Sequence, residues 1–129
     1  MEEHKLPIRI YFEDTDAGGV VYYANYLKFA ERARSECCRE KGYSHALDFK
    51  NSNHCFVVRH CEAEYLSPAR LDDLVDVYTK FTAIKNASTI MEQRICLGEK
   101  ELVKIKTAMV YVNEEFKPTR IPDEIRNKL

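Results

Sequence analysis

Residues 13–26 read E-D-T-D-A-G-G-V-V-Y-Y-A-N-Y, and they join the end of a strand-like pattern to the start of a helical one. Their carboxylates and glycines are close in sequence: Glu13, Asp14, Asp16, Gly18 and Gly19. A carboxylate can act as a base or a nucleophile, and free N–H groups at a helix start can bind an anionic oxygen. This order of residues predicts a compact hydrolytic site. Spacing alone leaves an acidic surface turn open as the alternative.

On the N-terminal side of this stretch, apolar and polar residues alternate. Over residues 5–13, Ile8, Ile10 and Phe12 fall on one face of the pattern. Such alternation is typical of a strand with one buried face, and a proline near its start is tolerated at a sheet edge. We therefore expect a half-buried strand that reaches Glu13.

On the C-terminal side, the apolar period changes to that of a helix. From Asn25 to Lys41, small and apolar residues recur at helical spacing, and Gly42 follows as a residue that ends helices. Asn25 is a suitable N-cap, because its side-chain oxygen can accept a hydrogen bond from a free backbone N–H, and a first turn that begins one or two residues earlier is the alternative. The sequence therefore predicts one long helix directly after the Gly-rich turn.

The rest of the chain is rich in strand-forming residues. Strand-like runs follow the helix, separated by short turn segments, at 55–66, 74–84, 88–97 and 101–112. The breaks between the runs are short enough for antiparallel hairpins. Residues 122–125 read as a short terminal helix with a proline near its first position.

This order of elements predicts an α+β fold. One strand, one long helix and the later strands fit an antiparallel sheet wrapped around the helix, in a single domain over residues 1–129. The run 101–112 is apolar on both faces, which is typical of a central or interface strand. Because such a sheet has unpaired edges, we expect copies of the chain to associate edge to edge.

The composition is that of a globular protein with no bias toward nucleic acid. Charged residues make up 32% of the chain and the net charge is −1, so no electrostatic footprint for DNA or RNA is present. No apolar run approaches the roughly 18 residues of a membrane span, and no signal-peptide core is evident, so we expect a cytoplasmic protein. The 5 cysteines lack CxxC spacing, so neither a disulfide framework nor a metal site is expected.

Two motifs in this chain resemble a known family. Residues 11–34, Y-F-E-D-T-D-A-G-G-V-V-Y-Y-A-N-Y-L-K-F-A-E-R-A-R, are similar to the signature of hot-dog fold acyl-CoA thioesterases. The similarity is greatest to the YbgC-like, Tol–Pal-associated branch of the 4-hydroxybenzoyl-CoA thioesterase family. Residues 65–74, Y-L-S-P-A-R-L-D-D-L, resemble the same branch. The first motif is long and specific, and the resemblance covers nearly the whole chain.

The resemblance implies an acyl-CoA thioesterase without a metal or a bound cofactor, since CoA enters as part of the substrate. It implies that Asp16 is the catalytic carboxylate, as a nucleophile or as a general base, and that the backbone N–H of Tyr23 binds the thioester carbonyl. Gly18 and Gly19 would let the backbone pass close to the substrate, because they lack a Cβ atom. The expected assembly is a homodimer or a homotetramer built from dimers, with active sites at the dimer interface.

The tyrosines around the first motif have two possible roles. Aromatic residues between a strand and a helix usually pack in the core, but Tyr11 and Tyr26 can instead line an acyl pocket and bind substrate. Tyr11 is the better candidate for a polar contact, because it falls on the opposite face from Ile10 and Phe12.

One position departs from the pattern of the YbgC-like branch. Enzymes of that branch usually carry a histidine where this chain has Tyr23, which matches the hydroxybenzoyl branch instead. The backbone role survives this change and any role of the imidazole does not, so we expect weaker activity or a different acyl preference. The rival functions are a hot-dog hydratase or dehydratase, and a non-catalytic module that binds acyl thioesters or an acyl carrier protein.

Other chemically capable residues have simpler structural explanations. We expect Glu31 to contact Arg34 or Ser35 on its own helix rather than to act as the catalyst. His60 follows the strand alternation and is expected in the core or at an interface. Arg70 is expected to pair with a nearby aspartate rather than to bind a CoA phosphate.

Overall fold

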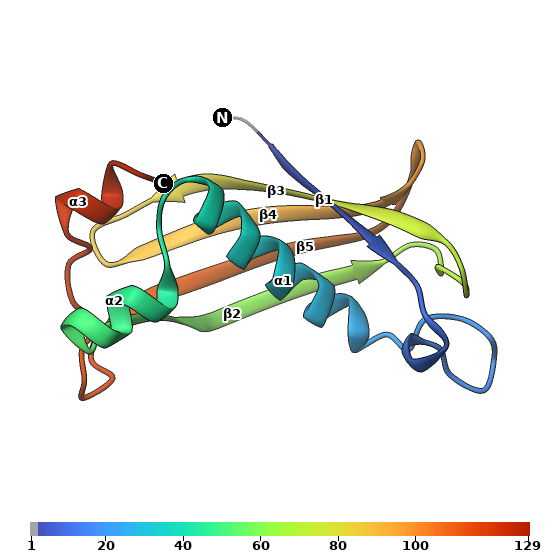
Figure 1. Cartoon of the computed structure of the whole chain (residues 1–129), viewed down its shortest axis with the longest axis horizontal. Helices are drawn as coiled ribbons and strands as arrows, with labels where there is room; N and C mark the ends of the chain where they lie inside the picture. Colours follow the sequence, from blue (N-terminus) through green and yellow to red (C-terminus); the bar gives the residue numbers. More distant parts are fainter. Residues whose placement is uncertain (1–2) are drawn as a thin grey trace.

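A five-stranded antiparallel sheet with one long helix packed against it forms the body of the molecule (Figure 1). The structure, a computed structural model, describes residues 3–129. The strands lie in the order β1-β3-β4-β5-β2, and they span His4–Arg9 (β1), Cys55–Tyr65 (β2), Leu74–Ile84 (β3), Ser88–Leu97 (β4) and Lys100–Val112 (β5). The helices span Asn25–Glu40 (α1), His45–Ser52 (α2) and Asp123–Arg126 (α3), and a 3-10 turn, η1, spans Phe12–Asp14. The predicted α+β hot-dog arrangement is confirmed.

Most of the predicted elements occur at the expected positions. Strands β3 and β4 have the predicted bounds, and β5 begins one residue before the predicted run. Strand β5 pairs with both β4 and β2, which confirms that it is central in the sheet. The predicted long helix is α1, and Gly42 follows it with a φ of +91°, a conformation that favours glycine.

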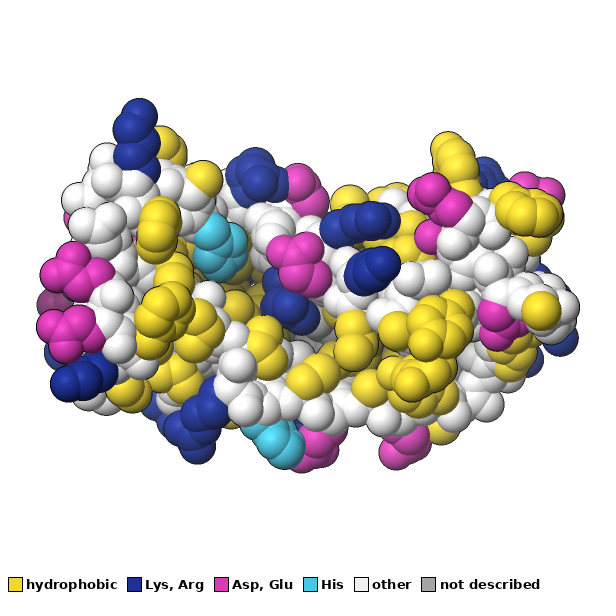
Figure 2. All heavy atoms as spheres, turned by 90° about the horizontal axis from the view of Figure 1, so that it is seen from below, with side chains coloured by type: hydrophobic (Ala, Val, Ile, Leu, Met, Phe, Trp, Pro, Cys, Tyr) yellow, Lys and Arg dark blue, Asp and Glu magenta, His cyan; other side chains and the backbone are white. Residues whose placement is uncertain are grey.

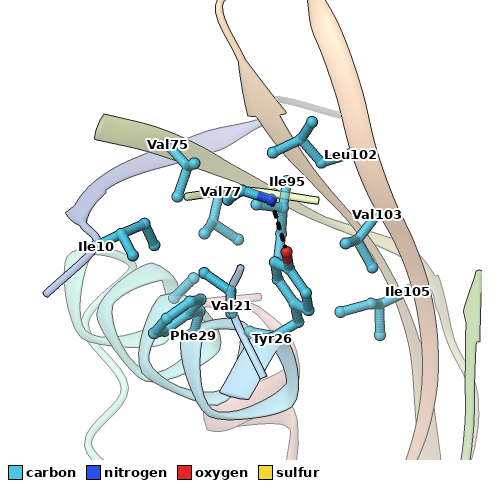
Figure 3. Close-up of a cluster of buried hydrophobic side chains, with 13 residues drawn as sticks. Ile10, Val21, Tyr26, Phe29, Val75, Val77, Ile95, Leu102, Val103 and Ile105 are labelled. Atoms are coloured by element: carbon cyan, nitrogen blue, oxygen red, sulfur yellow. Dashed lines mark hydrogen bonds between the residues drawn. The ribbon is translucent and has the colours of Figure 1, made fainter. Parts of the chain in front are cut away.

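The core lies between the buried face of α1 and the sheet. Figure 3 shows the cluster around the first half of the helix, where Tyr26 and Phe29 meet apolar side chains of β3, β4 and β5. Phe29 is almost fully buried, which contributes roughly 1.5–3 kcal/mol. Ala30 and Ala33 are also buried, and their small side chains let the helix approach the sheet closely.

A second core cluster lies around the last turns of α1. It contains Cys37, Cys38, Tyr43, Phe81, Met91, Tyr111, Ile121 and Ile125. In this region Asp48 of α2 accepts hydrogen bonds from the hydroxyls of Tyr43 at 2.7 Å and of Tyr111 at 2.9 Å. Burial and the Asp48 carboxylate raise the pKa of both hydroxyls, that of Tyr111 to about 12, so both remain protonated donors.

The prediction for the first strand was wrong at its C-terminal end. Strand β1 stops at Arg9, and Phe12 is 81% exposed instead of facing the core, while Ile10 is buried as expected. The chain turns here because Asp14 accepts a hydrogen bond from the Tyr11 backbone N–H at 2.8 Å and closes η1. A local side-chain bond to the backbone therefore replaces the last strand residues.

Two further predictions are met only in part, and one element was missed. Asn25 is the first residue of α1 rather than its N-cap, so the helix begins one residue earlier than an Asn25 cap would place it, and the Asn25 side-chain amide donates to the Asp14 carbonyl at 2.9 Å. His60 is exposed beside Glu62, so it lies outside the core, and its place at an interface stays a prediction. Helix α2 was not predicted; it has no buried residues, so it shows little apolar periodicity, and the Ser44 side chain caps its start.

Candidate active site

The carboxylate-rich stretch forms a tight turn next to the start of α1. Thr15 and Val21 form an isolated antiparallel bridge, and the Asp16 N–H donates to the Val20 carbonyl at 2.9 Å. Gly19 has a φ of +79°, so its conformation is one that other residues rarely adopt. The turn therefore holds Asp16 at a fixed place in the backbone.

The Asp16 side chain is fixed by the same turn. Its Oδ1 accepts a hydrogen bond from the Gly18 N–H at 2.8 Å, and a Cβ atom on Gly18 would lie 3.2 Å from that oxygen. Its Oδ2 has no hydrogen-bond partner among residues 3–129, and the residue is exposed in the single chain. One carboxylate oxygen thus orients the group, as in the surface-turn alternative, while the other remains able to react or to accept a proton.

Backbone donors remain available just before α1. The N–H groups of Asn25, Tyr26 and Leu27 donate to carbonyls three residues earlier in the chain. No acceptor within the described part of the chain bonds the N–H of Tyr23 or of Ala24. The helix dipole adds positive potential at this end, so an oxygen that gains negative charge is stabilised here. This is the arrangement predicted for the Tyr23 N–H.

An open cleft of about 250 Å³ lies beside the helix start. Its lining comes from both sequence motifs: Val21, Tyr23, Tyr26, Tyr65, Leu66, Ser67 and Pro68. The Tyr65 ring lies 5.9 Å, centroid to centroid, from the rings of both Tyr23 and Tyr26. The walls are aromatic and apolar, which suits an acyl group.

Direct hydrogen bonds join the two motifs. The Val21 N–H donates to the Ala69 carbonyl at 2.9 Å, and the Ala69 N–H donates to the Tyr26 hydroxyl at 2.9 Å. Figure 3 shows this second bond from the Tyr26 ring, which is otherwise buried among apolar side chains. Burial raises the pKa of Tyr26, so its hydroxyl is neutral. The segment 65–74 therefore fixes the position of the helix start.

The sequence-predicted site residues form two groups. Asp16, Gly18 and Gly19 share one turn, and Tyr23 and Tyr26 line the cleft. The bridge between Thr15 and Val21 joins the turn to the cleft wall, but Asp16 itself is not in the lining. Tyr26 offers the cleft its ring, because its hydroxyl already accepts the Ala69 N–H. The catalytic and substrate-binding roles remain predictions.

Tyr11 and Tyr65 differ from what the sequence indicated. Tyr11 is 63% exposed and does not line the cleft. Tyr65 was not singled out as a site residue, although it belongs to the second motif, which was the available signal. The position of Tyr65 in the cleft follows from the fold, which packs the end of β2 against the start of α1.

Glu31 and Arg70 are two further residues for which the sequence predicted structural contacts. Glu31 accepts a hydrogen bond from the Ser35 hydroxyl at 3.1 Å, which confirms the expected contact on its own helix. The Asp73 carboxylate binds the Arg70 backbone N–H rather than its guanidinium, and that guanidinium forms no ion pair with any described residue. The expected Arg70–aspartate pair was therefore wrong.

Exposed aromatic side chains surround the candidate site. The exposed fractions are 63% for Tyr11, 81% for Phe12, 48% for Tyr22 and 61% for Tyr23. Figure 2 shows hydrophobic side chains gathered at the end of the molecule that carries this segment. Exposed apolar side chains that gather in one region are typical of surfaces that bind a ligand or another chain.

The fold and this site define a class of protein. A family model described as the thioesterase superfamily matches residues 18–104, and the chain belongs to that superfamily. The match begins two residues after Asp16, so it leaves the role of that carboxylate open.

Individual relatives place the chain in the YbgC-like branch that the motifs indicated. It is 40% identical over 123 residues to the acyl-CoA thioester hydrolase YbgC of Escherichia coli O6:H1, covering 94% of this chain and 91% of that protein. It is 39% identical to the acyl-CoA thioesterase YbgC of Haemophilus influenzae, covering 94% and 90%. A probable thioesterase from Bartonella henselae is 40% identical and superposes with a TM-score of 0.89, covering 94% of this chain and 100% of that one.

Proposed function

We propose that this protein is an acyl-CoA thioesterase, which hydrolyses acyl-CoA to a free carboxylic acid and CoA. The observation that carries this proposal is the Asp16 carboxylate, fixed by its own turn and followed seven residues later by Tyr23, whose unbonded N–H lies just before α1. The aromatic cleft beside the helix start offers a place for the acyl group. We propose the whole chain as one catalytic domain that needs no metal and no cofactor.

The proposed chemistry needs one base or nucleophile and one oxyanion donor. Asp16 either attacks the thioester carbonyl carbon, expelling CoA thiolate and leaving an anhydride that water hydrolyses, or it takes a proton from a water that attacks the same carbon. In both routes the carbonyl oxygen gains negative charge, and the Tyr23 N–H donates to it. Because CoA leaves as a stable thiolate, the site does not need a strong acid.

We propose further that the active protein is a dimer joined along β2. This strand lies at a sheet edge, is 11 residues long and pairs only with β5 among the described strands. Long edge strands are templates for pairing, and its exposed apolar residues include Val58 and Tyr65. Since Tyr65 lines the cleft, pairing there would set the active site beside the interface; a dimer of dimers is the larger assembly that the resemblance implies.

We propose a cytoplasmic location, where acyl-CoA and acyl carrier protein are the thioesters available. Within residues 3–129, no helix is both long and apolar enough to cross a membrane. We propose acyl carrier protein as a second carrier. The cleft residues would contact the acyl group, which is the same in both kinds of thioester.

The proposal is tested with Asp16→Asn, which keeps the oxygen that accepts the Gly18 N–H and removes the charge. Release of CoA from a panel of acyl-CoA substrates should fall by about 10²–10⁴-fold, the usual loss when a catalytic base is removed. Asp14→Asn is the matched control, since Asp14 holds η1 through the Tyr11 N–H, and it should keep most of the turnover.

Each rival function has its own result in these assays. Unchanged turnover in Asp16→Asn would remove Asp16 from the reaction. Hydration of crotonyl-CoA by the wild-type protein would identify a hydratase, and capture of acyl carrier protein without turnover on any acyl-CoA would identify a binding module. Light scattering tests the dimer, and a monomer that retains full turnover would contradict the proposed interface.

A further inference from the structure

Strand β2 has a free edge, and its pairing with β5 shows which of its residues point to each face of the sheet. Residues opposite each other in an antiparallel pair point to the same side. The residues of β2 on the face toward α1 are Phe56, Val58, Cys61, Ala63 and Tyr65, which lie opposite Tyr111, Met109, Thr107, Ile105 and Val103. The outer face carries Val57, His60, Glu62 and Glu64. The register shift between Val58 and His60 leaves Arg59 as the extra residue of a bulge.

The face toward α1 leaves apolar surface uncovered at this edge. Val58 is 50% exposed and Tyr65 is 44% exposed, and Cys61, between them, is also exposed. Figure 2, seen from the side on which β2 lies in Figure 1, shows hydrophobic side chains on this side of the molecule. A long edge strand with exposed apolar residues is suited to pairing with another strand.

The cleft at the C-terminal end of β2 is small and open in the single chain. Its volume of about 250 Å³ is below the roughly 300–1,000 Å³ of most pockets that bind small molecules. Among its lining residues, Tyr65 alone belongs to a strand. Within the described sheet no further strand lies beyond β2 to continue that wall. The cleft therefore lacks a wall on the edge side of Tyr65.

The polar residues of the outer face favour one way of pairing β2 with the same strand of a second copy. A two-fold axis makes this pairing antiparallel, and residues of the same face must meet. A pairing centred on Glu62 would set two carboxylates opposite each other, which is unfavourable. A pairing centred on His60 would set Glu62 opposite the partner's Val57. Only a pairing centred on Cys61 sets His60 opposite the partner's Glu62, and Glu62 opposite the partner's His60.

The same register agrees with the contact that His60 makes in its own chain. The His60 Nε2 lies 3.0 Å from the Glu62 Oε1. Two copies joined at Cys61 would therefore close a ring of alternating imidazoles and carboxylates on the outer face. This complementarity between equal strands identifies a second copy of the chain as the partner of the β2 edge.

With this register the partner's strand supplies the missing wall of the cleft. Beyond the bulge, Ala63 lies opposite the partner's Val58, and Tyr65 lies opposite the partner's Phe56, all on the face toward α1. The Cβ atoms of opposite residues are about 4.5–5.5 Å apart, and those of diagonal neighbours, such as Tyr65 and the partner's Val58, are about 7–8 Å apart. In its own chain Val58 is about 20 Å along the strand from Tyr65.

We propose that two copies pair along β2 with Cys61 at the two-fold axis, and that the partner's Val58 lines the acyl cleft beside Tyr65. The proposal rests on the thioesterase function, and it adds the register of the dimer and a residue that each copy gives to the site of the other. An acyl chain then lies between the tyrosine rings of one chain and the aliphatic wall of its partner. Neither chain has a complete site alone.

The register is tested without any substrate. Opposite Cα atoms in an antiparallel pair are about 4.5–5.5 Å apart, within the roughly 4.4–6.8 Å that a disulfide spans. Oxidised glutathione should therefore join two wild-type chains through Cys61, giving a dimer on a non-reducing gel that dithiothreitol separates. Cys55→Ser should still form this link, and Cys61→Ser should not. A wild-type dimer that forms no Cys61 link would overturn the register.

Charge substitutions test the same register in solution. His60→Glu sets like charges opposite each other at two places and should raise the dissociation constant of the dimer about tenfold. Adding Glu62→Lys to that variant sets opposite charges there again and should return the dissociation constant toward the wild-type value. Analytical ultracentrifugation measures both constants. A dimer that His60→Glu does not weaken, or that the second substitution does not restore, would contradict the pairing.

Mixed dimers test whether the partner's Val58 lines the cleft. Val58→Trp should lose most of the turnover, because its indole fills the cleft of the other chain, and Asp16→Asn should lose about 10²–10⁴-fold. In a mixed dimer, the intact Asp16 of one chain lies beside the intact Val58 of the other. Coexpression of the two variants should therefore give turnover about tenfold or more above that of either variant alone.

The mixed dimers also separate this proposal from the thioesterase function itself. Mixed dimers confirmed by mass that turn over no faster than either variant would overturn the role of the partner's Val58. Absence of turnover in the wild-type protein would refute the thioesterase function and with it the acyl contact of Val58. In that case the Cys61 link and the charge substitutions still decide whether the chains pair along β2 in this register.

Discussion

The two ends of helix α1 differ in how completely their polar groups are bonded. Beyond the C-terminal end, Asp48 accepts hydrogen bonds from the hydroxyls of Tyr43, Tyr111 and Ser52, so its carboxylate is fully bonded although it lines an open cleft of about 530 Å³. At the N-terminal end, one oxygen of Asp16 and the N–H of Tyr23 have no partner in the described chain. Both ends carry an aspartate, tyrosines and an open cleft, yet in the described chain only the N-terminal end combines an unbonded carboxylate oxygen with an unbonded backbone N–H.

This difference indicates a division of labour along one helix. Satisfied buried polar groups add stability and specify a single packing, whereas unsatisfied groups beside a cleft cost stability and are retained for binding or chemistry. The exposed rings of Tyr11, Phe12 and Tyr23 agree with this division, because a chain selected for stability alone would bury them. Substitutions at the two ends should therefore affect different measurements.

The largest effect on stability is expected at the C-terminal end. Asp48→Ala would leave two buried tyrosine hydroxyls without their acceptor, at a cost of about 3 kcal/mol in the free energy of unfolding. Urea unfolding measures this cost. Asp48→Asn retains an acceptor oxygen and should lose clearly less; equal losses in the two variants would mean that the hydrogen bonds are not the cause.

A smaller loss is expected where the two motifs meet. Tyr26→Phe removes the hydroxyl that accepts the buried Ala69 N–H, and leaving that donor unpaired should cost about 1–2 kcal/mol. Urea unfolding gives the cost, and turnover of an acyl-CoA should also fall because the helix start is less firmly placed. Tyr111→Phe is the control at the other end of α1. It also removes a tyrosine hydroxyl, and it should leave turnover per folded molecule unchanged.

Much of this fold could be predicted from the sequence because its elements are long and strongly patterned. Strands β3 and β4 and helix α1 combine apolar periodicity with clear turn signals at their ends. The chain between Arg9 and Asp14 was misjudged because one hydrogen bond, from the Tyr11 N–H to Asp14, overrides the alternation. Helix α2 lies on the surface and carries no apolar stripe to detect.

The candidate site was predictable only in part, for a related reason. Asp16, Gly18 and Gly19 are neighbours in sequence, so their turn could be inferred from the motif. Tyr65 joins the cleft through packing of the end of β2 against α1, and no local pattern encodes that contact.

Substitutions of the two glycines in the Asp16 turn should affect different measurements. Gly19→Ala should cost about 1 kcal/mol in stability, because φ is +79° and a Cβ atom is disfavoured there. Gly18→Ala should leave the unfolding free energy nearly unchanged but lower kcat, since its Cβ would press on the Asp16 Oδ1 at 3.2 Å. Parallel unfolding and turnover assays separate these effects, and a reversed pattern would refute this description of the turn.

The smallest effect concerns pH. Burial, together with Arg34 and Arg39, lowers the pKa of His45 in the folded protein, while Glu31 and Asp48 act in the opposite direction. The unfolded chain therefore takes up the proton first, and stability should be fully present above about pH 6.5 and decline as the pH falls below it. His45→Gln should flatten the decline in the free energy of unfolding below about pH 6.5; an unchanged slope would exclude His45 as its source.

The most direct test measures Asp16→Asn and Asp48→Ala together, each for its urea midpoint and for its turnover per folded molecule. Asp16→Asn should unfold at the wild-type midpoint, because Asn keeps the bond to the Gly18 N–H, and should lose turnover by orders of magnitude. Asp48→Ala should unfold at a lower midpoint and retain turnover in the molecules that remain folded. If Asp16→Asn turns over acyl-CoA at the wild-type rate, the division between a reactive and a structural end of α1 is wrong.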